Sequence, residues 1–180
     1  GHIIKDDRYR RPQERFSGTF LEYLEIVKQD PSKTILAHQR MYEIVTEPGV
    51  EVLKTEDYPR LRRIYGNDTI KRYKFFENDF YGIDKTIMEI VRYFHSAAMS
   101  GEESRQVLYL VGPVGSGKSS IMEKLKQALA TSPLIYALKG CPMREEPLHL
   151  IPHHLRPQFE EILGTRIEGD LCPICRYRLL

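Results

Sequence analysis

Residues 106–119 read QVLYLVGPVGSGKS, and this stretch decides the fold. Its first six residues form a short apolar run rich in β-branched and aromatic side chains, which is typical of a buried parallel strand. From Lys118 onward, apolar residues recur at helical spacing and predict an amphipathic helix with an inner face made of Ile121, Met122, Leu125, Ala128 and Leu129. Residues 112–119 between them match G-x-x-x-x-G-K-[ST], in the strand-to-helix setting that this motif requires.

The motif predicts a site for a nucleoside triphosphate such as ATP, together with Mg²⁺. Its glycines let the backbone approach phosphates closely, and the helix N-terminus adds unpaired N–H groups and a positive dipole end. Lys118 would reach the β- and γ-phosphates, and the Ser119 hydroxyl would ligate Mg²⁺. A glycine-rich turn without a ligand is the alternative, and the complete motif in its context favours binding. The predicted binding residues are Gly112, Pro113, Val114, Gly115, Ser116, Gly117, Lys118, Ser119 and Ser120.

Composition excludes several classes of protein. The 180 residues are 41% hydrophobic and 29% charged, with a formal net charge of +2, too small to indicate a nucleic-acid or anionic-membrane partner. No window approaches the ~20 apolar residues of a membrane span, and the polar start is not a signal peptide. Three cysteines without a secretory signal indicate reduced thiols and a cytoplasmic protein.

We expect an α/β protein of the P-loop NTPase class in three parts. Residues 1–16 form a charged, flexible arm, residues 17–70 a helical region that begins with a helical hairpin, and residues 71–180 an incomplete nucleotide-binding domain. A second predicted strand over 134–138 makes the sheet parallel, because a strand–helix–strand crossover joins parallel strands. Arginines, lysines and tyrosines interleave over 50–75, where a solvated surface is favoured over a nucleic-acid surface.

Cys172 and Cys175 have the spacing of half a zinc site. Cys141, His149, His153 or His154 could supply further ligands. Two unmodified thiols are slightly favoured over a Zn²⁺ site in these 180 residues, and a redox pair is less favoured because no thioredoxin-type βαβ unit surrounds the motif.

The sequence leaves the catalytic residues unidentified. A P-loop NTPase needs an acidic residue at the end of a later strand to hold Mg²⁺ and position water. No apolar run that ends in Asp follows Ser119. We therefore expect these 180 residues to bind nucleotide but to be inactive alone. Upstream, Tyr81-Gly82-Ile83 could wrap an adenine ring or could be an ordinary loop that enters a helix.

Six stretches resemble the bacterial PrkA family, called serine protein kinases, whose nucleotide module is of the AAA+ class. They run over nearly the whole chain: FSGTFLEYL (16–24), LAHQRMY (36–42), FFENDFYG (75–82), GPVGSGKS (112–119), EPLHL (146–150) and GDLCPICR (169–176). The resemblance implies an ATP-dependent enzyme acting on a protein substrate in bacterial stress, stationary-phase or sporulation regulation. It also implies a homo-oligomer of a longer protein, and adenine contacts from Tyr81, Gly82 and Ile83.

Three functional readings remain open. The family name implies a protein serine kinase, but the sequence lacks the H-R-D and D-F-G motifs of eukaryotic-type kinases. The residues favour an AAA+ motor or regulatory ATPase. The non-enzymatic alternative is a module that senses ATP or ADP and recruits a partner.

Overall fold

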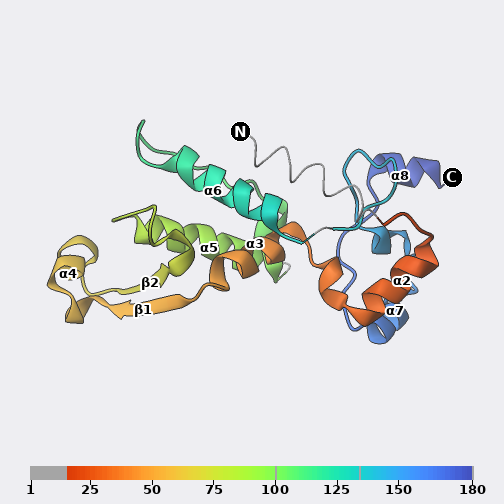
Figure 1. The fold of residues 1–180 in the computed structure, drawn as a ribbon, viewed down its shortest axis with the longest axis horizontal. Helices are drawn as coiled ribbons and strands as arrows, with labels where there is room; N and C mark the ends of the chain where they lie inside the picture. The colour runs from red at the N-terminus through yellow and green to blue at the C-terminus, as the bar shows by residue number, and fades with distance from the viewer. Residues whose placement is uncertain (1–15, 100, 134, 180) are drawn as a thin grey trace. The chain divides into compact units, whose positions relative to one another are not determined.

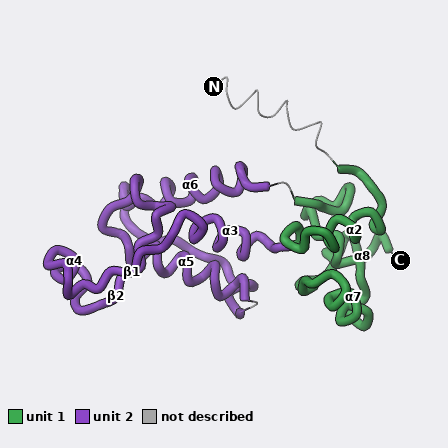
Figure 2. Tube along the Cα trace, turned by 60° about the horizontal axis from the view of Figure 1, so that its bottom comes forward, with its two compact units in different colours: residues 1–34, 134–180 green, residues 35–133 purple. Residues whose placement is uncertain are grey.

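The structure is a computed structural model that describes residues 16–99, 101–133 and 135–179. The chain forms two compact units, coloured separately in Figure 2: Gly1–Thr34 with Leu134–Leu180, and Ile35–Pro133. The arm expected over 1–16 lies, apart from Phe16, outside the described residues. The domain boundaries expected at 16/17 and 70/71 differ from the limits of these two units. The three expected parts of the chain stay a prediction.

The first unit consists of helices around a small apolar core. Its elements are α2 (Phe20–Gln29), the 3₁₀ turns η2 (Pro31–Thr34) and η6 (Pro147–Leu150), α7 (Arg156–Leu163) and α8 (Pro173–Arg178). The Thr19 side chain accepts the Glu22 N–H and the Glu22 carboxylate accepts the Thr19 N–H, which is a capping box at the start of α2. Its buried core consists of Tyr23, Val27, Leu148, Ile151, Leu163 and Ile167.

The second unit combines α-helices with a β-hairpin (Figure 1). Its elements are α3 (Ala37–Thr46), β1 (Val50–Lys54), η3 (Thr55–Asp57), α4 (Pro59–Tyr65), β2 (Thr69–Tyr73), η4 (Lys74–Phe76), α5 (Asp84–Ala98), η5 (Glu102–Arg105) and α6 (Lys118–Thr131). Strands β1 and β2 are antiparallel, with Leu53 opposite Ile70. The buried core consists of Met41, Val45, Tyr73, Phe76, Ile87, Ile90, Val91, Ile121 and Leu125.

The parallel sheet expected from the sequence is absent from the described residues, whose only sheet is the two-stranded hairpin. Neither 106–111 nor 135–138 belongs to a strand. Burial nevertheless alternates before the loop: Leu108 and Leu110 pack against the core, whereas Val107, Tyr109 and Val111 are exposed. The run expected to be a buried strand has one packed face and one exposed face, and it pairs with no neighbouring strand among the described residues. The parallel core stays a prediction.

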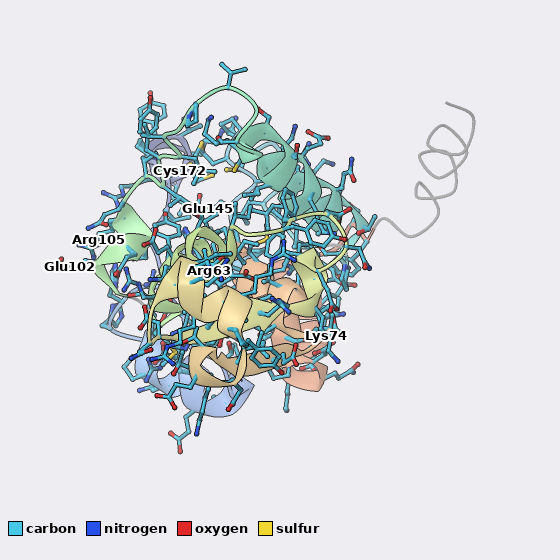
Figure 3. The ribbon with its side chains drawn as sticks, turned by 90° about the vertical axis from the view of Figure 1, so that its left-hand side faces the viewer. Arg63, Lys74, Glu102, Arg105, Glu145 and Cys172 are labelled. Carbon is cyan, nitrogen blue, oxygen red and sulfur yellow. The ribbon has the colours of Figure 1, made fainter. Side chains whose placement is uncertain are left out.

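The expected helical hairpin is also corrected. Helix α2 packs against α7 in the first unit, and α3 packs against α5 and α6 in the second. The segment 50–75, most of which falls within the region expected to be helical (17–70), contains β1, α4 and β2, with arginines such as Arg63 exposed (Figure 3). In α6, Ile121 and Leu125 are buried as predicted, but Met122 is exposed. Every helix of the described residues is too short or too polar to cross a membrane.

Candidate functional site

The predicted phosphate-binding loop leads into the N-terminus of α6. Helix α6 begins at Lys118, and its N-cap is Gly117, with a φ of 82° and no capping side chain. Gly115 also has a φ of 82°, a conformation that glycine adopts without steric cost. Because no side chain caps α6, the N–H groups of its first turn stay available to an anion. Ser119 and Ser120 are exposed in this turn.

The Lys118 ammonium folds back onto the loop. Its Nζ donates hydrogen bonds to the carbonyl oxygens of Gly112 and Pro113, both at 2.6 Å, and to the Ser116 hydroxyl at 2.9 Å. Val114, at the tip of the loop, is fully exposed. The loop thus holds one cation at its centre beside an uncapped helix N-terminus, and both features attract phosphate.

The segment before α5 lies next to this loop. Asp79 forms an ion pair with Lys124 of α6, and a Cβ placed on Gly117 would lie 3.7 Å from the Phe80 ring. Tyr81 follows with 83% of its surface exposed. Gly82 has a φ of 75°, and Ile83 is the half-buried N-cap of α5. The structure therefore brings the predicted adenine segment close to the predicted phosphate loop.

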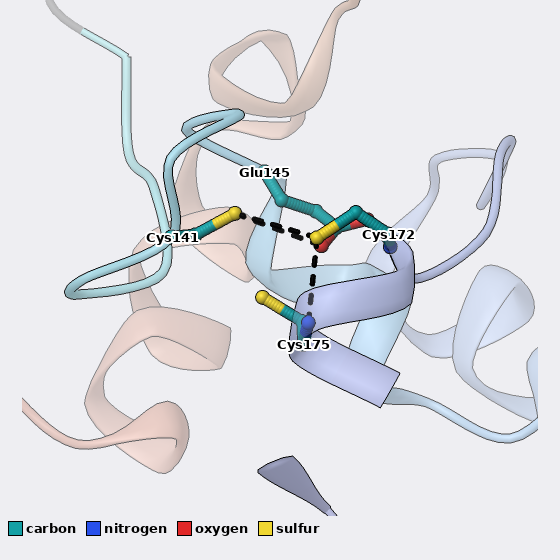
Figure 4. Close-up of side chains that lie close together, drawn as sticks. All are labelled: Cys141, Glu145, Cys172 and Cys175. Atoms are coloured by element: carbon teal, nitrogen blue, oxygen red, sulfur yellow. Dashed lines mark hydrogen bonds between the residues drawn. The ribbon is translucent and has the colours of Figure 1, made fainter. Parts of the chain in front are cut away.

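A second constellation lies in the first unit, and it joins four side chains (Figure 4). The donor atoms of Cys141, Glu145, Cys172 and Cys175 all lie within 4.8 Å of one another. Cys141 Sγ is 3.8 Å from Cys172 Sγ and 3.9 Å from Glu145 Oε2. All except the half-buried Cys172 are buried, and Figure 3 labels Cys172 and Glu145 in the context of the whole chain.

The three histidines that the sequence offered as further ligands lie outside this cluster. His149 contacts Glu145 Oε1 at 3.3 Å and the Glu168 carbonyl oxygen at 2.5 Å, so it supports the cluster from outside. His153 forms an exposed ion pair with Asp170, and His154 is exposed. Sequence reasoning included Cys141 and missed Glu145, which nothing in the sequence alone distinguishes from a solvated surface glutamate.

The protonation equilibria of the cluster differ among its members. Burial raises the pKa of Glu145, but hydrogen bonds from the Cys172 N–H and its other neighbours outweigh burial and bring this pKa below its usual value. Burial raises the pKa of the Cys175 thiol to about 12. For Cys141, burial is outweighed by hydrogen bonds from the backbone of Glu145 and its neighbours, and the pKa is lowered. The surroundings thus favour deprotonation of Glu145 and Cys141 and disfavour deprotonation of Cys175, relative to the free side chains.

A comparison with protein families identifies this chain. The model of the PrkA AAA domain matches residues 18–180. The chain belongs to the PrkA AAA domain family. An AAA-type domain has the P-loop NTPase fold, whose members bind nucleotides. The loop at the start of α6 therefore occurs in a chain of this fold class.

Curated relatives of this PrkA-type chain carry different names. It is 38% identical to the "ATP-dependent protease PrkA" of Bacillus subtilis, over 98% of the chain and 27% of that protein. It is also 38% identical to the "Serine/threonine kinase YeaG" of Escherichia coli K12, over 80% of the chain and 23% of that protein. The chain therefore spans about a quarter of the length of these relatives, both named as enzymes. No solved structure matches it significantly.

Proposed function

We propose that the chain is the nucleotide-binding module of an ATP-dependent enzyme, and that it binds ATP or ADP with Mg²⁺ through Gly112–Ser119. The single observation that carries this proposal is the loop itself. Its lysine converges on the same small region as the uncapped N-terminus of α6, within a chain of the PrkA AAA domain family.

The backbone of the loop, Lys118 and Ser119 have different roles in this proposal. The backbone N–H groups at the start of α6 would hold the phosphate oxygens. Lys118 would exchange its contacts with Gly112, Pro113 and Ser116 for the β- and γ-phosphates, which makes the loop reorganise on binding. The exposed Ser119 would place its hydroxyl on Mg²⁺.

Tyr81, Gly82 and Ile83 would contact the adenine ring. The ion pair between Asp79 and Lys124 supports this role, because it fixes the segment beside the helix that follows the loop. The Tyr81 ring is largely exposed and can stack on a base. The positive φ of Gly82 lets the backbone turn there.

The sheet is part of the same proposal. The alternating burial over 106–111 suits a strand with one face already packed, which would pair with other strands of a parallel AAA+ sheet. The loop would then lie at the carboxyl end of that strand, where ligands bind in open α/β sheets.

For the whole enzyme, we propose that ATP binding and hydrolysis drive an action on a protein substrate in the bacterial cytoplasm, within a homo-oligomer that serves stress or sporulation regulation. The relatives are named as an ATP-dependent protease and as a serine/threonine kinase, which are two different chemistries. Transfer of labelled phosphate to an added protein would favour the kinase, and ATP-dependent peptide-bond cleavage would favour the protease.

The nucleotide proposal is tested by displacing a fluorescent ATP analogue from the chain. We expect ATP and ADP to compete strongly, AMP much more weakly, and Mg²⁺ to improve competition by ATP, because the loop binds β- and γ-phosphates. Ser119→Ala should remove most of the Mg²⁺ effect. Equal competition by ATP and AMP, with no effect of Mg²⁺, would contradict the proposal.

A further inference from the structure

We propose that Cys141, Glu145, Cys172 and Cys175 form a closed, four-ligand structural zinc site, which fastens the C-terminal helix α8 to the loop over 139–145. The four residues belong to the first unit, whereas the phosphate loop belongs to the second. Glu145 completes the ligand set that the pair Cys172/Cys175 only began.

The distances match the shape of a zinc site. With a Zn–S bond of about 2.3 Å, a tetrahedron places two sulfur atoms about 3.8 Å apart, and a sulfur and a carboxylate oxygen about 3.5 Å apart. The Cys141 and Cys172 sulfur atoms are 3.8 Å apart, and Cys141 Sγ is 3.9 Å from Glu145 Oε2. The remaining separations are at most 4.8 Å, so modest side-chain closing completes the tetrahedron.

The groups around the cluster orient its donors. The second carboxylate oxygen of Glu145, Oε1, accepts the Cys172 N–H at 2.7 Å and contacts His149 Nδ1 at 3.3 Å. These contacts leave Oε2 facing the sulfur atoms (Figure 4). The Cys175 N–H points to Cys172 Sγ at 3.4 Å. Outer contacts of this kind orient and tune the ligands of protein metal sites.

The chemistry of the donors selects the metal and its role. Three thiolates with one carboxylate in a tetrahedral arrangement suit Zn²⁺ better than Mg²⁺ or Ca²⁺, which prefer oxygen ligands in larger numbers. Four protein ligands leave no open position for water or substrate. A closed site of this type stabilises a fold rather than catalysing a reaction.

Helix α8 needs such a fastening, because apolar packing holds it weakly. It has six residues, and isolated helices of this length are unstable. Its apolar side chains Ile174 and Tyr177 are exposed, and its only buried residue is Cys175. The Arg178 guanidinium donates to the Gly140 carbonyl oxygen at 2.9 Å, which adds a second tie between the same two segments.

The test measures metal in the 180-residue chain purified without chelators and under reducing conditions. We expect close to one zinc per chain by elemental analysis, retained against a weak chelator. The Cys172→Ser/Cys175→Ser double variant should lose the zinc. Replacing zinc by Co²⁺ provides a readout that needs no variant: a tetrahedral thiolate site gives intense visible bands and sulfur-to-cobalt charge transfer.

Single variants separate the ligands from their surroundings. Glu145→Gln should weaken zinc binding strongly, and His149→Ala should weaken it by about 10–100-fold, as losses of outer contacts do. His153→Ala is the matched control, because His153 is exposed and outside the cluster. The zinc affinity of this control variant should equal that of wild type. Metal-free wild-type protein with three freely titratable thiols, a disulfide between Cys141 and Cys172, or a Co²⁺ spectrum without thiolate bands would each overturn the proposal.

Discussion

Arg156 is a buried charge that should stabilise the first unit strongly. It begins α7, and its guanidinium donates to three backbone carbonyls: to Ile151 at 3.1 Å, to Ile167 at 3.3 Å and to Gly169 at 2.8 Å. Its side chain is 10% exposed. The guanidinium thereby fixes the chain that leads into Cys172. We predict that Arg156→Ala destabilises the protein more than any exposed arginine does.

The magnitude follows from the carbonyls that lose their donor. A buried group left without a hydrogen bond costs about 1–3 kcal/mol. Three such carbonyls set the upper limit of the destabilisation, and water that enters the space and donates to them lowers it. The ion pair with Asp170 adds little, because Asp170 is 58% exposed and the two atoms are 3.7 Å apart. We expect a loss of about 3 kcal/mol. In a chain of this size, that lowers the melting temperature by roughly 6–12 °C.

The assay is thermal and urea unfolding followed by circular dichroism, because the chain contains no tryptophan. Arg166→Ala is the matched control: Arg166 is exposed in the same region, and its loss should change stability by less than about 0.5 kcal/mol. Arg156→Lys should fall between the two, since one ammonium cannot reach three carbonyls. If Arg156→Ala melts within about 1 °C of Arg166→Ala, our account of this anchor is wrong.

Two further predictions concern stacking and pH. Tyr81→Ala should weaken ATP binding by about tenfold, because stacking of a base on an aromatic ring contributes about 1–3 kcal/mol. Its binding of tripolyphosphate, which has no base, should stay unchanged. Tyr58→Ala is the control, and equal losses of ATP affinity in both variants would exclude a role of Tyr81 in adenine binding. Burial raises the pKa of Glu146 above its ordinary value of 4.5, against hydrogen bonds from the Tyr23 hydroxyl and the Leu148 N–H. The folded state then holds the Glu146 proton more tightly than the unfolded state, so stability falls as the pH rises from about 4.5 through the raised pKa. Glu146→Gln removes this titration, so its melting temperature relative to wild type should increase from pH 4 to pH 7; a constant difference would contradict the shift.

Local patterns in the sequence predicted helix α6 well. The apolar spacing in α6 depends on residues three or four positions apart, and the structure has this helix beginning at Lys118, where the pattern places it. A strand needs a partner that can lie anywhere in the chain. The apolar run before Gly112 therefore showed which side chains pack against the core, but it could not show which segments would pair with it.

The candidate sites divide in the same way. The phosphate loop is contiguous, so its motif names all of its residues. The cysteine cluster joins residues 141–145 to residues 172–175, and Glu145 has no signature of its own because most glutamates are solvated surface residues. Arg156 was missed for the same reason: only the fold shows that three carbonyls converge on its guanidinium.

The central claim is that this chain binds nucleotide through the loop before α6, and titration of a fluorescent ATP analogue with Mg²⁺ tests it most directly. Wild type and two variants are compared: Lys118→Ala, which removes the cation at the centre of the loop, and Lys126→Ala, which removes an exposed lysine from the same helix. We predict saturable binding by wild type and Lys126→Ala, and loss of binding in Lys118→Ala with the fold intact. Equal affinity in all three proteins, or no binding by wild type, would contradict the account.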